Sequence, residues 1–127
     1  MIGTSRVVKV WGYARPADLR KGYNGLFGLV QQELRRDPLS GEMFIFVNRR
    51  RTSCKVLFWD GTGLCLFCKR LEQGLFAKLW ERGEADEPVS LTSAELTLFL
   101  EGCELIGRQR LSPPESGPRA LVDDRRL

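Results

Sequence analysis

Residues 43–71 read MFIFVNRRRTSCKVLFWDGTGLCLFCKRL, and they carry the clearest strand pattern in the chain. It holds three apolar runs, at 43–48, 54–59 and 64–71, each of ordinary strand length. The polar loop RRRTS joins the first two runs. The turn DGTG at 60–63 joins the last two and supplies the glycines that a tight hairpin needs for positive φ. We therefore predict three strands in an antiparallel meander.

The residues before the meander predict a strand and a long helix. RVVKVW at 6–11 alternates enough to indicate a short strand. Pro16 suits a first helical turn and Asp18 suits the positive end of a helix dipole, so we predict a helix over 16–36 that Pro38 ends. Six apolar residues form one stripe at helical spacing in that segment: Leu19, Tyr23, Leu26, Phe27, Val30 and Leu34.

Three glycines interrupt the predicted helix, at Gly22, Gly25 and Gly28. Each costs about 1 kcal/mol relative to alanine in a helix interior. Their presence indicates either a close approach by another element or a bent helix, and the sequence leaves both open.

The residues after the meander predict a small C-terminal part. We expect a strand over 74–82, with a short helix as the alternative, a short strand in VSL at 89–91, and a helix over 92–102. Thr92 followed three residues later by Glu95 is a capping-box pattern, and Gly102 is a typical helix stop. The predicted fold is a single small α+β domain over residues 1–107, with a central antiparallel sheet, one long N-terminal helix packed on it and a short C-terminal helix. Residues 108–127 are rich in Pro, Gly, Ser and charge, which predicts a disordered tail.

The totals agree with one globular domain. The chain has 127 residues, of which 43% are apolar and 28% charged. No run of 18 apolar residues exists, so we expect no membrane helix. The first residues lack an apolar segment of the secretory kind, which favours a cytoplasmic protein with reduced thiols.

Charge is distributed unevenly along the chain. Residues 1–82 carry 15 Lys and Arg against 7 Asp and Glu, whereas residues 83–127 carry 5 against 9. A basic body with an acidic C-terminal part favours a polyanionic partner for the body. The alternative is a solvated surface that serves solubility alone.

The cysteines give a C-x-x-C spacing at Cys65 and Cys68. Both lie in one predicted strand, where positions three apart point to opposite faces, so one metal ion could not bind both sulfurs. The chain has no histidine and no second C-x-x-C. We expect no metal and no other cofactor, and interpret the cysteines, Cys54 and Cys103 included, as buried packing residues.

Catalysis is difficult to support from this sequence. Without histidine, the usual base for attack by serine or cysteine is missing. A metal-dependent nuclease could use Asp18, Asp60 and Glu72, but Asp18 suits a helix start and Asp60 suits a turn. We therefore predict a protein that is not an enzyme.

Basic clusters are the remaining functional signal. Arginine and lysine on loops and strand ends suit contacts to nucleic-acid phosphates. Antiparallel order also predicts that the end of the strand 64–71 returns to the arginine loop, which would gather positive charge at one edge. The predicted nucleic-acid-binding residues are Arg20, Lys21, Arg49, Arg50, Arg51, Lys55, Lys69 and Arg70.

Several motifs resemble the small accessory protein of IS66-type bacterial insertion sequences, an Orf2-like family. The resemblance runs from about Val8 to Gly102. The matching motifs are D-L-R-K-G at 18–22, D-P-L-S-G at 37–41, F-I-F at 44–46, the run KVLFWDGTG at 55–63 and K-R-L-E at 69–72. Cys68 departs from the aromatic residue usual in the family, and the segment 77–88 departs from its usual proline-rich stretch.

The resemblance implies a role in transposition, a form of DNA recombination, beside a separate transposase that carries the catalytic acids. It implies context and no biochemical activity. Two main hypotheses follow: a non-enzymatic accessory factor that binds DNA through its basic edge, or a module that docks on the transposase through an aromatic residue or the W-D-G turn.

Overall fold

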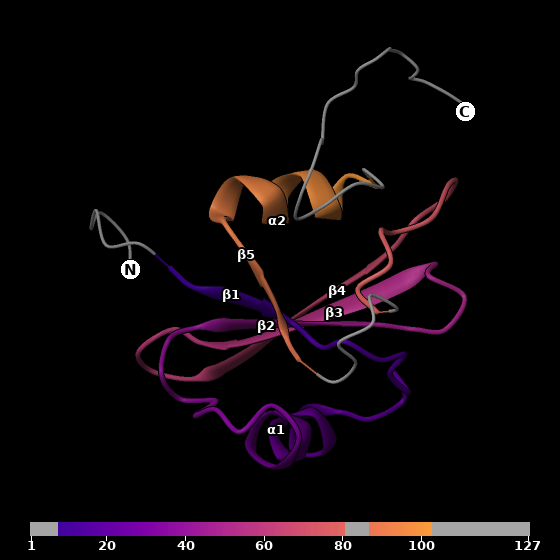
Figure 1. Ribbon diagram of the computed structural model, residues 1–127. Coiled ribbons are helices and arrows are strands. Elements are labelled where there is room, and N and C mark those ends of the chain that lie inside the picture. The colour runs from indigo at the N-terminus through magenta and orange to yellow at the C-terminus, as the bar shows by residue number, and fades with distance from the viewer. Residues whose placement is uncertain (1–7, 81–86, 103–127) are drawn as a thin grey trace.

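A five-stranded sheet lies between two helices (Figure 1). The computed structural model describes residues 8–80 and 87–102. Its elements in chain order are β1 (Val10–Gly12), α1 (Tyr23–Gln32), β2 (Met43–Val47), β3 (Ser53–Trp59), β4 (Leu64–Arg70), β5 (Val89–Leu91) and α2 (Ser93–Leu100). The strands lie in the order β4-β3-β2-β1-β5. The α+β class is confirmed.

The predicted meander is confirmed in β2, β3 and β4, which pair antiparallel in sequence order. The sheet as a whole is mixed, so the expectation of a purely antiparallel sheet was wrong. β1 pairs parallel with β2, with Val10 opposite Met43, and antiparallel with β5. A parallel pair needs a crossover connection, and the chain between β1 and β2 provides it by passing through α1.

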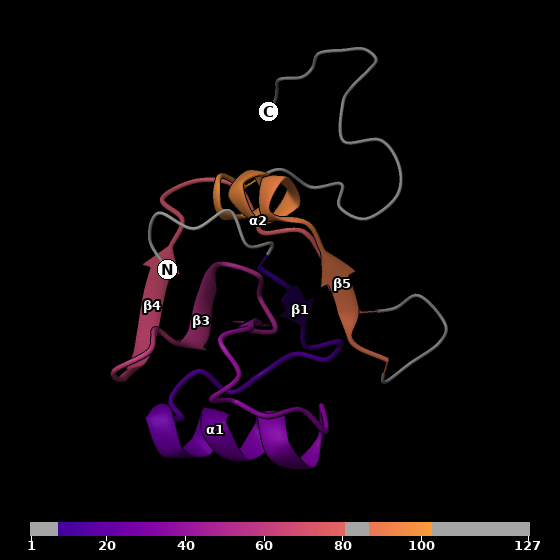
Figure 2. The ribbon, with the colours of Figure 1, turned by 90° about the vertical axis from the view of Figure 1, so that its left-hand side faces the viewer.

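Each face of the sheet has its own apolar core, and Figure 2 shows α1 on one face and α2 on the other. Because strand side chains alternate between faces, neighbouring residues of β2 belong to different cores. Phe44 and Phe46 pack with Leu26 and Val30 of α1. On the opposite face, Ile45 belongs to the core that includes Phe99 of α2. We call these the α1 face and the α2 face.

The predicted long helix over 16–36 was wrong in extent, because α1 has only 10 residues and begins at Tyr23. The segment before it bends and turns, and parts of it lie beside β2. The amide of Tyr13 donates to the carbonyl of Ile45 at 2.9 Å, and the amide of Ala17 donates to that of Val47 at 2.8 Å. These sheet-like hydrogen bonds outweigh the local helix signals, so Pro16 does not begin a helix.

The helix glycines resolve into different roles. Gly22 is the N-cap of α1 and has extended backbone. A Cβ at Gly25 would lie 2.7 Å from the Cβ of Lys21, whereas one at Gly28 would meet open space. Close approach therefore explains Gly25 alone, and the neighbour is Lys21, the residue before the N-cap.

The C-terminal elements follow the prediction except in one segment. The β5 strand and α2 are confirmed, and Thr92 and Glu95 form the predicted capping box. A strand was expected over 74–82, but residues 74–80 form neither helix nor strand, and residues 81 and 82 lie outside the described residues. The Phe76 ring stacks on that of Phe99, with centroids 5.1 Å apart, so core packing replaces strand pairing there. The predicted tail at 108–127 lies outside the described residues.

Candidate nucleic-acid interface

The loop between β2 and β3 is held by the side chain of Asn48. Its Oδ1 accepts hydrogen bonds from the amides of Thr52 at 2.9 Å and Ser53 at 3.0 Å, and its Nδ2 donates to the Thr52 hydroxyl. An asparagine side chain that bonds nearby backbone in this way fixes a turn. The tip of the fixed turn exposes Arg49 and Arg50 to solvent.

Arg51 differs from its two neighbours, because it is part of the fold. Its φ is +63°, an unusual value for a residue with a side chain. Its Nη1 donates to the carbonyl of Phe76 at 3.1 Å, and the Phe76 amide donates to the Arg51 carbonyl at 2.8 Å. This arginine therefore ties the loop to the buried segment around Phe76.

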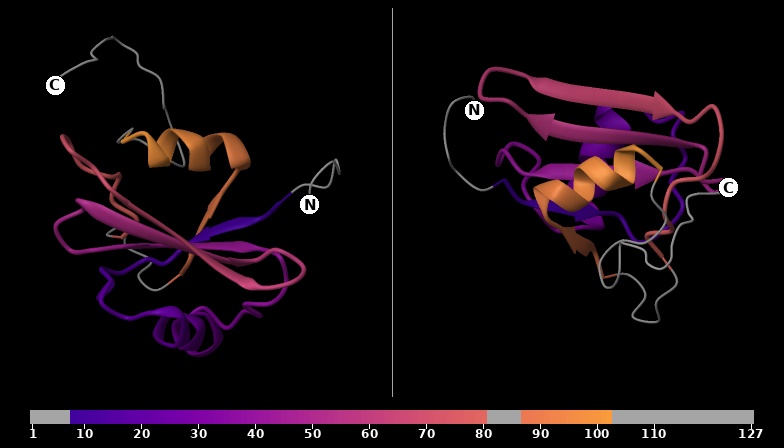
Figure 3. Two further views of the ribbon diagram at one scale, coloured as in Figure 1. Left: turned by 180° about the vertical axis from the view of Figure 1, so that it is seen from behind. Right: turned by 90° about the horizontal axis from the view of Figure 1, so that it is seen from above.

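The end of β4 lies beside the arginine loop, as predicted. Arg70 pairs with Ser53, and the Leu71 amide donates to the carbonyl of Thr52 at 2.9 Å. Figure 3 shows β4 at the outer edge of the sheet, next to β3. The antiparallel hairpin thus places Arg70 beside the loop that carries Arg49 and Arg50.

Lys69 and Arg70 project from opposite faces of the sheet. The Nζ of Lys69 donates to the Leu100 carbonyl at 2.7 Å, so it caps the C-terminal end of α2, where a positive charge is favoured. Arg70 shares its strand face with Leu64 and Leu66, which pack in the α1-face core. The Lys69 ammonium is therefore bonded within the fold, on the face opposite to that of Arg70.

A shallow depression of about 700 Å³ lies where residues 17–20 pass the ends of β3 and β4. The Nζ of Lys55 lies 3.5 Å from the Lys21 carbonyl, which links β3 to the start of α1. The polar and charged residues that line the depression are Asp18, Arg20, Asn48, Ser53, Lys55, Lys69 and Arg70. Four basic residues thus border one concave surface, and one of them, Lys69, already donates its ammonium to the Leu100 carbonyl.

Arg20 already has an acidic partner. Its Nε and Nη2 each lie 2.9 Å from a carboxylate oxygen of Asp18, and the Arg20 side chain is largely exposed while that of Asp18 is about half exposed. Hydrogen bonds from Arg20 hold the pKa of the Asp18 carboxyl well below its ordinary value, and the same contact raises the pKa of Arg20. Asp18 therefore orients and partly neutralises Arg20, and does not start a helix.

Asp60, the second acid of the nuclease alternative, also serves the fold. Its Oδ1 accepts the amides of Thr62 and Gly63, each at 2.9 Å, within the hairpin turn where Gly61 has φ of +107°. These backbone hydrogen bonds lower the pKa of the Asp60 carboxyl. Asp60 lies in the turn at one end of β4, whereas Glu72 follows the other end, so the hairpin holds them apart.

The cysteines only partly match their expected packing role. Cys54 is buried, and burial raises the pKa of its thiol to about 12. Cys65 and Cys68 both lie in β4, as predicted, but Cys68 is exposed, so its interpretation as a buried residue was wrong. Cys103 lies outside the described residues. Within residues 8–80 and 87–102, no group of three or more His, Cys, Asp or Glu could hold a metal ion.

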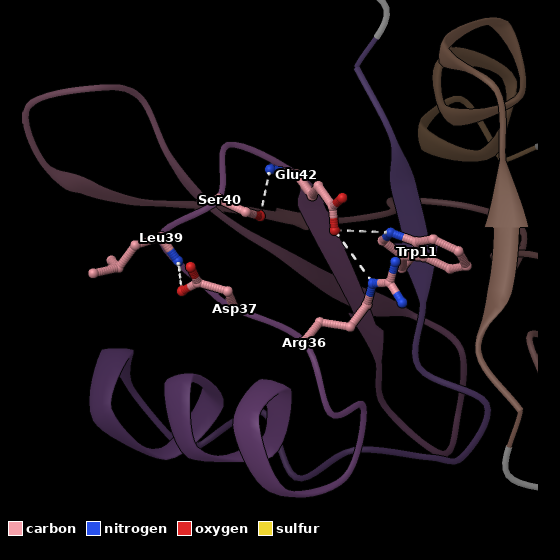
Figure 4. Close-up of polar contacts among 6 residues, drawn as sticks. All are labelled: Trp11, Arg36, Asp37, Leu39, Ser40 and Glu42. Carbon is pink, nitrogen blue, oxygen red and sulfur yellow. Dashed lines mark hydrogen bonds and ion pairs between the residues drawn. The ribbon is translucent and has the colours of Figure 1, made fainter.

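Sequence reasoning missed a cluster at Trp11, Arg36 and Glu42 (Figure 4). Glu42 Oε1 accepts from Trp11 Nε1 at 3.1 Å and from Arg36 Nε at 3.2 Å. The guanidinium carbon of Arg36 lies 4.0 Å from the centre of the Trp11 ring. No local pattern connects residues this far apart in sequence, and the cluster shows that Arg36 stabilises the junction of α1 with β1 and β2.

The D-P-L-S-G motif forms the turn beside that cluster. Asp37 Oδ1 accepts from the Leu39 amide at 2.9 Å, and the Ser40 hydroxyl accepts from the Glu42 amide at 3.2 Å (Figure 4). Gly41 has φ of +93°, which favours glycine. The motif is therefore explained by the geometry of the connection between α1 and β2.

We call the surface formed by six of the eight predicted residues the basic end: Arg20, Lys21, Arg49, Arg50, Lys55 and Arg70. Arg51 and Lys69 are excluded because their side chains hold the fold together. Among the described residues, no carboxylate forms an ion pair with Arg49, Arg50 or Arg70. Uncompensated positive charge at one end of a small domain attracts polyanions.

The fold and this surface define a small α+β protein with one strongly basic end. The chain belongs to the IS66 Orf2-like family, whose model matches residues 8–110. That family is associated with transposition of insertion sequences, in an accessory role. None of the described helices is long and apolar enough to span a membrane.

Two proteins of Sinorhizobium fredii are similar to this chain. One, described as uncharacterized protein y4hO, is 35% identical over 104 residues, which cover 82% of this chain and 88% of the relative. The other, uncharacterized protein y4jC, is 41% identical over 76 residues, covering 60% of this chain and 65% of the relative. No solved structure matches the chain.

Proposed function

We propose that the chain is a non-enzymatic accessory factor in the transposition of an IS66-type insertion sequence, and that its basic end binds DNA phosphates. The observation that carries the proposal is the convergence of Arg49, Arg50 and Arg70 without a described carboxylate partner. The loop that presents the first two is held rigid by Asn48, so little ordering is needed on binding.

The proposal concerns phosphates and not bases. The exposed arginines lie on a turn and at a strand end, and no described helix presents them to a groove. Contacts of this kind give affinity that depends on salt and differs little between sequences. The separate transposase would then supply recognition and chemistry.

The test is a titration of labelled duplex DNA at several salt concentrations. The Arg49→Ala/Arg50→Ala double variant should bind all duplexes more weakly, and the slope of log affinity against log salt should fall by about 0.9 for each lost phosphate contact. Arg70→Ala should act in the same direction. Arg51 stays unchanged, because its loss would disturb the fold.

A matched control is Lys9→Ala. It removes one exposed positive charge that lies near the start of β2, away from the arginine loop. Lys9 lies beside Met43, at the start of β2, whereas the arginine loop follows its last residue. This variant should keep the parent slope. If the parent does not bind duplex DNA, or if the double variant binds like the parent across salt, the DNA proposal fails.

Failure of DNA binding would favour a module that docks on the transposase. Two exposed apolar side chains support this second candidate, since Leu39 and Phe67 are each 45% exposed. The W-D-G turn suggested by the sequence is less suited, because the Asp60 carboxylate is bonded within its own turn. Co-purification of the chain with its transposase in the absence of DNA would support docking.

A further inference from the structure

β4 is a seven-residue edge strand whose outer side, which we call its open side, has no strand partner among the described residues. Every residue from Leu64 to Arg70 pairs with β3, without a bulge, and no described strand pairs with its other side. The other edge strand, β5, has three residues and follows Pro88, which are common ways to protect a sheet edge. β4 contains no proline, and its middle residues are apolar.

The hydrogen bonds at the two ends of the hairpin show which backbone groups of β4 face outward. The Leu71 amide bonds the Thr52 carbonyl, and the Asp60 amide bonds the Gly63 carbonyl. In an antiparallel pair, residues that face the neighbouring strand alternate with residues that face away from it. The amides and carbonyls of Leu64, Leu66, Cys68 and Arg70 therefore point to the open side.

We propose that a second copy of this chain adds its β4 antiparallel to this edge, with Phe67 of each copy directly opposite the other. In this register all seven residues of both strands pair. Leu66 of each strand then exchanges backbone hydrogen bonds with Cys68 of the other. Phe67 falls at a position without such bonds, where opposite side chains approach most closely.

Charge and length select this register over its neighbours. A shift that centres the pair on Cys68 would leave only residues 66–70 paired, and a further shift would bring Lys69 opposite Lys69. With Phe67 at the centre, Lys69 lies opposite Cys65 and Arg70 lies opposite Leu64. Like charges therefore do not meet across the interface, and the half-exposed Phe67 ring gains an aromatic partner.

This pairing continues one sheet through both copies. The two-fold axis runs perpendicular to the sheet, so both α1 helices lie on one face and both α2 helices on the other. The two basic ends lie at opposite ends of the paired strands. The inference stands independently of DNA binding, because it rests on the strand edge and on Phe67.

The experiment measures the mass of the full chain by light scattering or sedimentation over a range of concentrations. The parent should form a species of twice the 14.5 kDa chain mass. Phe67→Lys and Phe67→Glu should each weaken self-association by at least about tenfold, because like charges would lie directly opposite. An equimolar mixture of the two variants should restore the dimer.

Leu39 offers the matched control, because it is equally exposed and lies in the turn before β2. Leu39→Lys and Leu39→Glu should dimerise like the parent. Cys68→Pro gives an independent test, since it removes an outward amide that β3 does not use. It should abolish the dimer while the circular dichroism stays like that of the parent.

Three results would overturn the proposal. The first is a parent that stays monomeric over the whole concentration range. The second is a Phe67 variant that dimerises as strongly as the parent. The third is a mixture of the two Phe67 variants that stays monomeric, since the proposed register places these side chains opposite each other.

Discussion

Arg51 and Phe76 are joined twice, by a backbone hydrogen bond of 2.8 Å and by a bond of 3.1 Å from the Arg51 guanidinium to the Phe76 carbonyl. Arg51→Ala should lower the free energy of unfolding by about 1–2 kcal/mol, because it removes the second bond. Arg51→Gly should be more stable than Arg51→Ala by about 1 kcal/mol, because glycine adopts φ of +63° without strain. Denaturant unfolding measures both.

Arg49→Ala is the control for that comparison and should stay within about 0.5 kcal/mol of the parent, since Arg49 is exposed. A glycine variant less stable than the alanine variant would contradict the role of the positive φ.

The burial of the Cys54 thiol predicts that the folded state loses stability at alkaline pH. Burial raises the pKa of its thiol from 9.0 to about 12, although nearby Lys69 acts in the opposite direction. The folded state therefore keeps a proton that the unfolded state loses above pH 9. The stabilisation is complete below that pH and is lost as pH rises toward 12, at up to about 1.4 kcal/mol per pH unit.

The measurement compares unfolding of the parent and of Cys54→Ala between about pH 8 and about pH 10.5. The variant should lose stability less steeply with pH than the parent, whatever its stability at neutral pH. Equal slopes for the parent and Cys54→Ala would refute the assignment.

The capping box of α2 predicts a second stability effect. The Thr92 hydroxyl accepts the Glu95 amide at 3.0 Å, and the Glu95 carboxylate accepts the Thr92 amide at 2.9 Å. Thr92→Ala should cost about 1 kcal/mol of unfolding free energy. Thr97→Ala removes an exposed threonine from the middle of the same helix and should lower the unfolding free energy by less. Thermal unfolding of both variants measures the difference.

The contact between Trp11 and Arg36 can be measured by a double-mutant cycle. Arg36→Ala and Trp11→Leu should show a coupling free energy of about 0.5–1 kcal/mol, from the 4.0 Å stacking and the shared Glu42 carboxylate. Arg35 is the residue before Arg36 and its side chain is exposed, so Arg35→Ala should show no coupling free energy with Trp11→Leu. Additive effects of Arg36→Ala and Trp11→Leu would exclude the interaction.

The parts of the fold that depend on local signals could be predicted from the sequence. Alternating apolar residues and the D-G-T-G turn predicted the meander, and Thr92 with Glu95 predicted the start of α2. The long helix failed because Ala17 finds a partner in Val47, far along the chain. Parallel pairing of β1 with β2 is equally non-local, so composition and periodicity could not reveal it.

The candidate site shows the same division. The return of Arg70 to the arginine loop follows from antiparallel order, and the structure confirms it. The separate roles of Arg51 and Lys69 depend on Phe76 and Leu100, which lie on elements that the sequence does not place beside the loop. Residue type alone could not distinguish a binding arginine from a structural one.

The place of β5 in the sheet has a consequence for how the chain folds during synthesis. The residues of β1 are synthesised by Gly12, but one of its two neighbouring strands is β5, in which Leu91 lies opposite Val10. β1 therefore cannot complete its pairing until most of the chain has emerged from the ribosome. The meander β2–β4 has only short connections and can form first. Folding should therefore proceed from the middle of the chain outward, with the β1–β5 pair closing last.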